Sequence, residues 1–528
     1  MPNTIGGTPK LLSYTGNPTS NFRMSSHKII RALHANLWLN AAGLVISFAA
    51  TVVLVRTMAP ALFAEYSAVI GIVTLATLVF EAGANSGLTR YMSEAERAHA
   101  RGTFFRRMLF RRWLAAFACG VALIVFGPMY ARSTQFSGLA AQPWIFVCVA
   151  AIVAAGLVRL LAYYGLLALF ETKTALLIQQ GFVVLKAVSL AAIALAGGGL
   201  VWLVSAVLVL AVVEAGWVNF RLWQHIGAER KPISKAFVNR AQAFGLLTIF
   251  DKTCAMLGSG TVLMLVLAPR HPAALIALLA LAIDLVGKLV SLTVMPMGNL
   301  VAPYFSQTND DPAAQGLAIA RVVKFSSLLY SFSVAAGLLI FPWFIPTVYG
   351  GRYSGAVVIA ILLLIPTAFE NWIRGCCSPA LLRNARYRQL MSVNVLQAVA
   401  TLATLVLIYN QRIEIVIAAV GCVRACVAAL NLVALLPLVP PQTFRIPWQG
   451  AAIGLGGCAF AYAAGWGLPL PPLPRLLIEG ALFAGLFYAG LRCLIFRDPD
   501  MLRIAQRILG TRIKFLGRIL PTPHIASL

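Results

Sequence analysis

The sequence predicts an all-α polytopic membrane protein of about 14 transmembrane helices, arranged as two six-helix lobes plus two extra C-terminal helices. Three observations support this fold class. Of the 528 residues, 60% are hydrophobic and only 11% are charged, whereas about a quarter of the residues in soluble domains are charged. The hydrophobic residues form unbroken runs of about 20, the length of a helix that crosses a ~30 Å hydrocarbon core. Most of the 42 Lys and Arg residues lie in alternate connections between these runs, as they do when they stay in the cytoplasm.

The first element is a helical hairpin in residues 40–91. Its two apolar runs, near 37–56 and 62–81, flank a short turn that ends at Pro60. Because the turn is so short, the two helices must lie antiparallel. Arg56 lies at the tip, which the distribution of basic residues places outside the cell. We therefore expect Arg56 to act as an outer gate or in substrate release, with an ordinary interfacial arginine as the alternative.

The other spans are apolar runs that end at Gly, Pro or basic residues. The turn at 268–272, between two later runs, resembles the first turn and indicates a weak parallel repeat of six spans. We expect the remaining spans near 113–131, 144–170, 176–197, 200–220, 244–268, 273–296, 323–341, 355–373, 389–409, 414–438, 449–467 and 473–495.

These spans divide the chain into lobes, connections and tails. Both termini fall on the cytoplasmic side of a multi-pass protein. The expected organisation is a flexible basic tail (1–35), an N-lobe (36–220), a basic cytoplasmic linker (221–243), a C-lobe (244–438), helices 13 and 14 (439–495), and a basic amphipathic tail (496–528).

The net charge of +26 follows from the cytoplasmic connections, so no nucleic-acid partner is needed to explain it. One of these connections, within 82–112, is rich in arginine. Its pattern is typical of an amphipathic helix on anionic lipid headgroups. The sequence leaves open whether the basic segment 90–112 binds membrane lipids or docks a cytoplasmic glycosyltransferase.

Ionisable residues inside spans are costly and therefore mark candidate functional sites. Four cations on two pairs of adjacent helices lie roughly 12–15 Å from the cytoplasmic ends. We expect them to line a central cavity that binds an anionic substrate, together with Arg424, while nearby acids form ion pairs or couple transport. The cations are Arg159, Lys186, Lys252 and Lys288, and the acids are Asp251, Asp284 and Glu214.

Several alternatives remain open at this point. Asp251, Lys252, Asp284 and Lys288 could form only a structural ion-pair cluster, and the acids could carry protons or hold Na⁺. No cofactor is expected beyond H⁺ or Na⁺ coupling. The nine cysteines show no metal-binding spacing, and no phosphate-loop or HExxH motif is present. An enzyme is therefore not expected.

The sequence resembles the flippases of bacterial polysaccharide repeat units, within the multidrug/oligosaccharidyl-lipid/polysaccharide exporter superfamily. The matching residues are Asn40 and Gly43 in the first span, the segments 56–60, 62–66 and 81–83 of the first hairpin, 250–252 (Phe-Asp-Lys), and 346–353. One departure from the family pattern is Ala64–Tyr66, where an acid and a glycine often precede the tyrosine.

The resemblance implies a flippase that moves undecaprenyl-pyrophosphate-linked oligosaccharide repeat units across the bacterial inner membrane by alternating access. The product would serve exopolysaccharide, capsule or O-antigen assembly, and other polysaccharide-assembly proteins would be partners. Helices 13 and 14 would form a groove for the lipid tail. The alternatives are a drug/cation antiporter of the same superfamily, or a membrane component of a polysaccharide polymerase or glycosyltransferase system.

Overall fold

The computed structural model describes most of the chain. The expected tails at 1–25 and 499–528 lie outside the described residues, as does most of the basic segment between 82 and 99. The described residues are 26–81, 100–169, 171–226, 231–293, 312–383, 386–466 and 471–498, together with Asn85, Gly87, Leu88, Tyr91, Met92 and Ala95.

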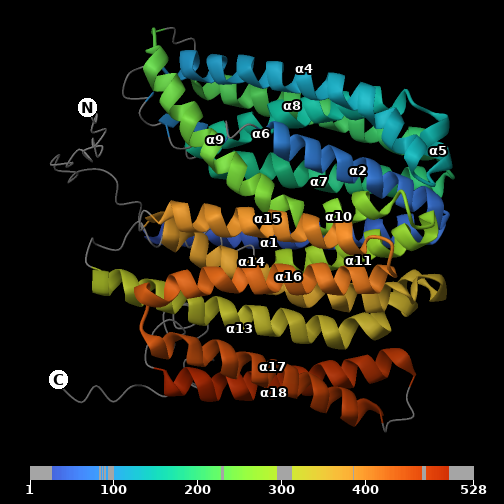
Figure 1. Cartoon of the computed structure of the whole chain (residues 1–528), viewed down its shortest axis with the longest axis vertical. Helices are drawn as coiled ribbons and strands as arrows, with labels where there is room; N and C mark the ends of the chain where they lie inside the picture. The colour runs from blue at the N-terminus through green and yellow to red at the C-terminus, as the bar shows by residue number, and fades with distance from the viewer. Residues whose placement is uncertain are drawn as a thin grey trace.

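The first half of the chain forms seven described helices that pack side by side (Figure 1). The helix α1 packs along α7, and α6 packs between α4 and α8. Pro60 is the first residue of α2, where its missing N–H needs no helical partner. These first-half helices are α1 (Ser26–Thr57), α2 (Pro60–Phe80), α4 (Arg101–Ser133), α5 (Ser137–Ala141), α6 (Ile145–Ala168), α7 (Thr172–Leu195) and α8 (Leu200–Ile226).

The second half begins with α9 (Lys235–Leu257), which crosses obliquely from the first-half helices toward α15 (Figure 1). Within this half, α14 packs against α11, α13 and α16. The other second-half helices are α10 (Gly260–Leu267), α11 (Ala273–Thr293), α13 (Pro312–Phe344), η1 (Ile345–Tyr349), η2 (Gly351–Tyr353), α14 (Ala356–Arg383), α15 (Tyr387–Ile408) and α16 (Ile413–Leu435).

The last two long helices lie together at the edge of the bundle (Figure 1). Both pack against α13, and Lys324 of α13 forms an ion pair with Asp498, 2.5 Å apart, just after the last helix. The elements of this part are η3 (Leu436–Leu438), η4 (Pro441–Phe444), α17 (Arg445–Trp466) and α18 (Pro472–Arg497).

The predicted all-α membrane fold is confirmed. Among the described residues, 11 helices are long and apolar enough to cross a membrane, and the chain is therefore a multi-pass membrane protein. The helices α1, α9 and α17 lie where three further spans were expected. The count of fourteen spans stays a prediction.

Three boundaries differ from the sequence-based expectation. The basic residues from Arg101 to Arg112 continue directly into α4 instead of forming a separate surface helix, because no helix-breaking residue separates them from the apolar run. The span expected at 244–268 is interrupted after Leu257, where Ser259 caps the short helix α10. The first helix begins at Ser26, within the expected tail.

The two ends of the bundle are named here after Arg56 and Glu81, at the end of α1 and just after α2. The largest hydrophobic core joins first-half and second-half helices, with α2 packed against α10 and α11. A second core lies toward the Glu81 end and includes Val238 and Ala241 of α9 together with residues of α4, α6 and α8. The start of α9 therefore packs with the first half, although most of the helix belongs to the second half in sequence.

Candidate functional site

Two adjoining cavities lie inside the bundle. The first, of about 410 Å³, lies between α1, α2 and α7 of the first half and α10 and α11 of the second half. The second, of about 340 Å³, lies between α2, α6, α7 and α8, with Met256 of α9 in its wall. Ile70, Thr74 and Lys186 line both cavities. A ligand in this region can therefore contact both halves of the chain.

Lys186 is the cation at the junction of the two cavities. It lies past the middle of α7, whose flanking apolar residues place it deep within the span. Among the described residues, its ammonium group makes no hydrogen bond or ion pair. An unpaired cation within a span is costly, so Lys186 is the residue whose charge a bound anion would best compensate. The sequence-based expectation for Lys186 agrees with this position.

Arg159 does have an acidic partner, contrary to the expectation that its charge stays free for the substrate. Its Nη1 lies 2.5 Å from Oε2 of Glu214 on the neighbouring helix α8. The hydroxyl of Tyr163 donates to the other carboxylate oxygen at 2.8 Å. Because α6 and α8 pack closely, their side chains meet even though the two residues are distant in sequence. In the wall of the second cavity, the charges of Arg159 and Glu214 therefore neutralise each other.

Lys252 pairs with a residue that the sequence-based site did not include. Its Nζ lies 3.1 Å from Oε1 of Glu81, just after α2, so the ion pair joins the two halves of the chain. In the alternative of a structural ion-pair cluster, Lys252 is grouped with Asp284 and Lys288, whereas among the described residues its ion-pair partner is Glu81. The side chain of Asp251 lies outside the described residues.

Lys288 and Asp284 form the expected pair one turn apart on α11, with Nζ 2.6 Å from Oδ2. This part of the prediction is confirmed. The same ammonium group donates to Oγ1 of Thr51 at 2.7 Å and to the carbonyl of Ser47 at 3.4 Å, both on α1. Lys288 therefore also connects the two halves. The Asp284 side chain remains 36% exposed and lines the first cavity.

The walls of the two cavities are nearly balanced in charge. Glu81, Glu214 and Asp284 supply three carboxylates, and Arg159 and Lys186 supply two cations. Each carboxylate has a cationic partner within 3.1 Å. The sequence predicts a strongly cationic cavity. In the structure, each carboxylate of the walls forms an ion pair, and Lys186 is the wall cation without an ion pair among the described residues.

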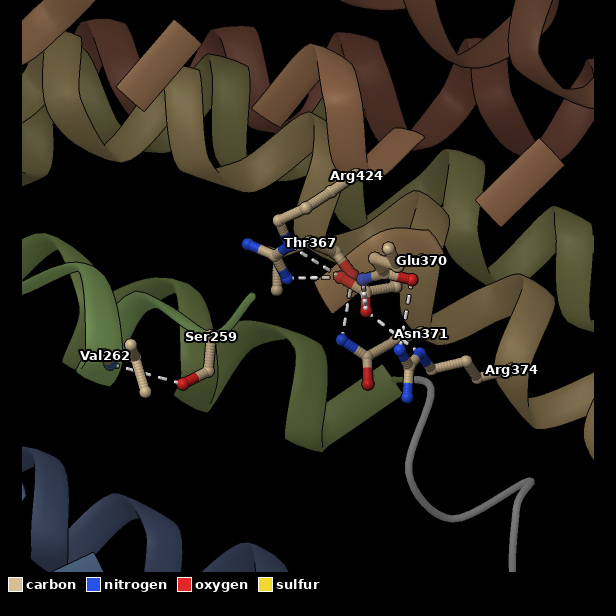
Figure 2. Close-up of polar contacts among 8 residues, drawn as sticks. Ser259, Val262, Thr367, Glu370, Asn371, Arg374 and Arg424 are labelled. Carbon is tan, nitrogen blue, oxygen red and sulfur yellow. Dashed lines mark hydrogen bonds and ion pairs between the residues drawn. The ribbon is translucent and has the colours of Figure 1, made fainter. Parts of the chain in front are cut away.

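Arg424 lies elsewhere, in a buried network of the second half (Figure 2). Its guanidinium donates through Nε at 2.8 Å and through Nη2 to Oε2 of Glu370 on α14. Oε1 of Glu370 lies 2.9 Å from Nε of Arg374 and accepts from Nε2 of Gln397 at 2.7 Å. Arg424 is only 5% exposed. It is therefore held within the helix packing and lines neither of the two cavities, unlike the sequence-based expectation.

This network also abuts the interruption between α9 and α10. A side chain at Gly258 would place its Cβ 3.3 Å from Nε of Arg424 and 3.3 Å from Nε2 of Gln397. The hydroxyl of Ser259 then accepts from the backbone N–H of Val262 and caps α10 (Figure 2). A side chain at this position would therefore have to displace the Arg424 or Gln397 side chain by a few tenths of an ångström.

Arg56 contacts the second half at the other end of the bundle. Its Nε donates to the carbonyl of Val348 at 2.6 Å and its Nη2 to that of Thr347 at 2.9 Å, both in η1. In the opposite direction, Arg352 of η2 donates hydrogen bonds to carbonyls at the end of α1, those of Val55, Arg56 and Met58. These free carbonyls at helix ends need donors. The position agrees with the expected gate contact, whose role stays a proposal.

Sequence reasoning missed four charged residues that the structure places in these networks: Glu81, Arg112, Arg352 and Glu370. Glu370 lies in the apolar run expected at 355–373, so a complete survey of charges in spans would have found it. Arg112 is 1% exposed and donates to the carbonyl of Glu81 and, at 2.5 Å, to Oδ1 of Asn85. It was grouped with the basic connection because only packing shows that it is buried.

The sequence matches a family model described as polysaccharide biosynthesis protein over residues 35–309. No curated protein matches it. Among solved structures, the lipid II flippase MurJ in its inward closed conformation is similar at 12% identity and a TM-score of 0.69, covering 89% of this chain and 100% of MurJ. An inward-facing multidrug resistance MATE family transporter of the MOP superfamily is similar at 13% identity and a TM-score of 0.61, covering 75% and 94% of the two chains.

A third similar structure is a MOP superfamily transporter from Pyrococcus furiosus, described as having a binding pocket of reverse polarity. The identity is 13%, the TM-score is 0.53, and the match covers 78% of this chain and 95% of that one. At these identities the structures show the fold alone. The family match over residues 35–309 confirms the resemblance to polysaccharide-biosynthesis proteins, and the similar structures, which are a flippase and transporters, confirm the fold.

Proposed function

We propose, from the premise that this chain belongs to the polysaccharide biosynthesis protein family, that it is a flippase for lipid-linked oligosaccharides. Its substrate would be an undecaprenyl-pyrophosphate-linked repeat unit, moved across the bacterial inner membrane for exopolysaccharide, capsule or O-antigen assembly. The family match and the MurJ-like fold support the coarser function of a transporter in polysaccharide biosynthesis. The substrate class is what the family resemblance implies, and the charge of the cavity supports its anionic part.

The observation that carries the proposal is the free ammonium group of Lys186 at the junction of the two cavities. A pyrophosphate that enters the junction would supply the missing counter-charge and form charge-assisted hydrogen bonds. Polar groups such as Thr74, Ser67 and Thr261 line the same region and could donate to sugar hydroxyls or phosphate oxygens. We therefore place the pyrophosphate next to Lys186 and the proximal sugars in the first cavity.

We further propose that the chain works by alternating access between an N-lobe (36–220) and a C-lobe (244–438). The contacts that join the two halves occur on both sides of the cavities. Lys252 holds Glu81 near one end, and Arg56 and Arg352 hold the opposite end. Breaking one set while keeping the other would open the cavity to one side of the membrane.

Coupling of transport to an ion is assigned to Asp284 in this proposal. Its carboxylate lines the first cavity and is more exposed than Glu214, whose two oxygens already have partners. A carboxylate that faces water inside a membrane protein can exchange a proton or bind Na⁺. Protonation of Asp284 would leave Lys288 with its contacts to α1 alone.

The proposed setting is the bacterial inner membrane with both chain termini in the cytoplasm. The basic residues of the described connections, including Lys231, Lys235 and Arg388, lie toward the Glu81 end, which we therefore assign to the cytoplasm. Helices α17 and α18 are proposed to form the groove for the lipid tail. Other polysaccharide-assembly proteins remain expected partners.

The test is the fate of the lipid-linked repeat unit in a strain that lacks the gene. A flippase predicts that the repeat unit accumulates on the cytoplasmic face, where an added membrane-impermeant glycosidase cannot reach it in intact spheroplasts. Complementation with the native chain should restore export, and a Lys186→Gln variant should not. Accumulation on the outer face would instead indicate a polymerase and would overturn the proposal.

The second candidate is a cation antiporter of the same superfamily. One observation favours it, because three carboxylates line the two cavities. Each of them is held by Arg159, Lys252 or Lys288. A cationic drug would have to displace one of these cations, whereas an anion has the free Lys186. Normal polysaccharide export together with drug sensitivity in the deletion strain would favour this candidate.

A further inference from the structure

A basic groove lies on the first turns of α4, away from the two central cavities. It is an open hollow of about 420 Å³ on the surface, lined by Thr103, Arg106, Arg107, Phe110 and Arg111. All five residues belong to one helix, and three of them are arginines. The groove lies at the Glu81 end of the bundle, where the basic part of α4 meets its apolar part.

None of the three arginines has an acidic partner among the described residues. Nη1 of Arg107 donates to the carbonyl of Ile233 at 3.0 Å, just before α9. Nη1 of Arg111 donates to Oε1 of Gln242 on α9. The guanidinium of Arg106 lies 5.4 Å from the centre of the Trp223 ring and is exposed. Each guanidinium has five donors, so several donors in this groove are free for an anion.

The apolar surface that follows the groove fits lipid chains. Phe110 is 65% exposed and Phe117 is 74% exposed. They lie on the same side of the helix, together with the exposed Trp113 and Leu114. In a chain that spans a membrane, such a surface contacts acyl chains, and the arginines just before it lie at the level of the headgroups. The cationic groove and the apolar surface are therefore continuous along α4.

We propose that this groove binds the phosphate of an anionic phospholipid whose acyl chains lie along the exposed face of α4. The planar guanidinium groups favour bidentate contacts with phosphate oxygens. Basic pockets on the cytoplasmic side of membrane helices are suited to such headgroups. An acidic protein segment would explain the arginines but leaves Phe110 and Phe117 without a partner, and for this reason a lipid is the better occupant.

The lipid would also stabilise the junction between the two halves. Arg107 and Arg111 connect α4 to the start of α9, whose first turns pack with the first half. A phosphate between these arginines reduces their mutual repulsion and orients them toward Ile233 and Gln242. The bound lipid therefore supports the position of α9, which carries Lys252. This site is independent of the substrate assigned to the central cavities.

The experiment measures lipid retained by the full-length protein. The protein is purified in detergent, equilibrated with equal amounts of palmitoyl-oleoyl-phosphatidylglycerol and palmitoyl-oleoyl-phosphatidylcholine, and analysed by native mass spectrometry. The test variant is Arg106→Gln, because Arg106 makes no described hydrogen bond that folding would need. The matched control is Arg132→Gln, an exposed arginine near the other end of the same helix.

We expect the native chain to retain phosphatidylglycerol in preference to phosphatidylcholine. One arginine near a lipid surface contributes about 1 kcal/mol, so Arg106→Gln should lower phosphatidylglycerol binding about fivefold. Arg106→Lys, which keeps the charge, should lose less, and Arg132→Gln should match the native chain. A Phe110→Ala variant should weaken retention of both lipids.

Three outcomes would overturn the proposal. The first is equal retention of the two lipids by the native chain. The second is a preference for phosphatidylglycerol that Arg106→Gln leaves unchanged. The third is that inorganic pyrophosphate at millimolar concentration displaces all Arg106-dependent phosphatidylglycerol, because the groove would then bind a soluble phosphate rather than a lipid. None of these results depends on the substrate of the transporter.

Discussion

Neutralising the ion pair between Lys252 and Glu81 tests whether this contact closes one end of the cavity. The two charges lie 3.1 Å apart, which corresponds to about 5 kcal/mol of attraction at an effective dielectric constant of about 20. The Glu81 side chain is 6% exposed and that of Lys252 is 33% exposed, so desolvation and solvent screening both reduce this value. We expect a net coupling of about 2 kcal/mol, or roughly 30-fold in the equilibrium between closed and open forms.

The assay follows access to the cavity. A cysteine at Thr74, which lines both cavities and bonds only within its own helix, is introduced after the nine native cysteines have been replaced. Inverted membrane vesicles are then treated with a membrane-impermeant maleimide. Glu81→Gln or Lys252→Gln should each raise the labelling rate about 30-fold, if labelling follows the open fraction.

The double variant gives the sharper result. If the two residues act as a pair, Glu81→Gln with Lys252→Gln should label no faster than either single variant. A charge swap is less informative, because Arg112 donates to the Glu81 backbone and would repel a lysine there. Lys235→Gln, at the exposed start of α9, is the control. Single variants within threefold of the native rate, or additive effects in the double variant, would refute the reasoning.

Three further predictions concern the other charged groups. Lys186→Gln should lower export at least tenfold but should not lower the unfolding midpoint, because no described bond is lost and a costly unpaired charge is removed; Lys173→Gln, on the same helix, should change neither export nor the midpoint. Glu370→Gln should lower the free energy of unfolding by about 3–5 kcal/mol in detergent, because Arg424 then stays buried without its counter-charge; the double variant with Arg424→Gln should recover part of the loss. Arg56→Gln should speed cavity labelling from the opposite face about fivefold or more, through two lost charged hydrogen bonds, and an unchanged rate would contradict the gate.

Most of the fold could be predicted from the sequence because membrane spans follow composition and length. The turn before Pro60 and the pair Asp284–Lys288 depend on local spacing, and both are as expected. The interruption at Gly258 and Ser259 could not be seen in the same way. It occurs inside an apolar run, next to the side chain of Arg424, which reaches this point from a helix far along the chain.

The candidate site was predicted less well, because depth in the membrane does not determine which helices are neighbours. Sequence spacing puts Arg159 and Lys186 at one level, yet of these two described cations only Arg159 forms an ion pair with Glu214. Lys252 is expected as a cavity cation, or alternatively in a cluster with Asp284 and Lys288, while its partner in the structure, Glu81, follows a helix of the first half. To predict the ion pairs of a helix bundle, one must therefore know which helices are neighbours, and hydropathy does not give this information.

The ion pair of Lys252 with Glu81 is compatible with both roles expected for this lysine, as a substrate-binding cation and as a member of an ion pair. Opening the bundle at the Glu81 end would separate α2 from α9, and Lys252 would then lose its counter-charge. A pyrophosphate beside Lys186 could replace Glu81 as the partner of Lys252. The substrate would then stabilise the open form by the free energy of its interaction with Lys252. In the proposed mechanism, the ion pair of the same lysine with Glu81 keeps the empty chain closed at this end. We therefore predict that soluble pyrophosphate speeds cavity labelling in the native chain but has no such effect in the Lys252→Gln variant, which is already open.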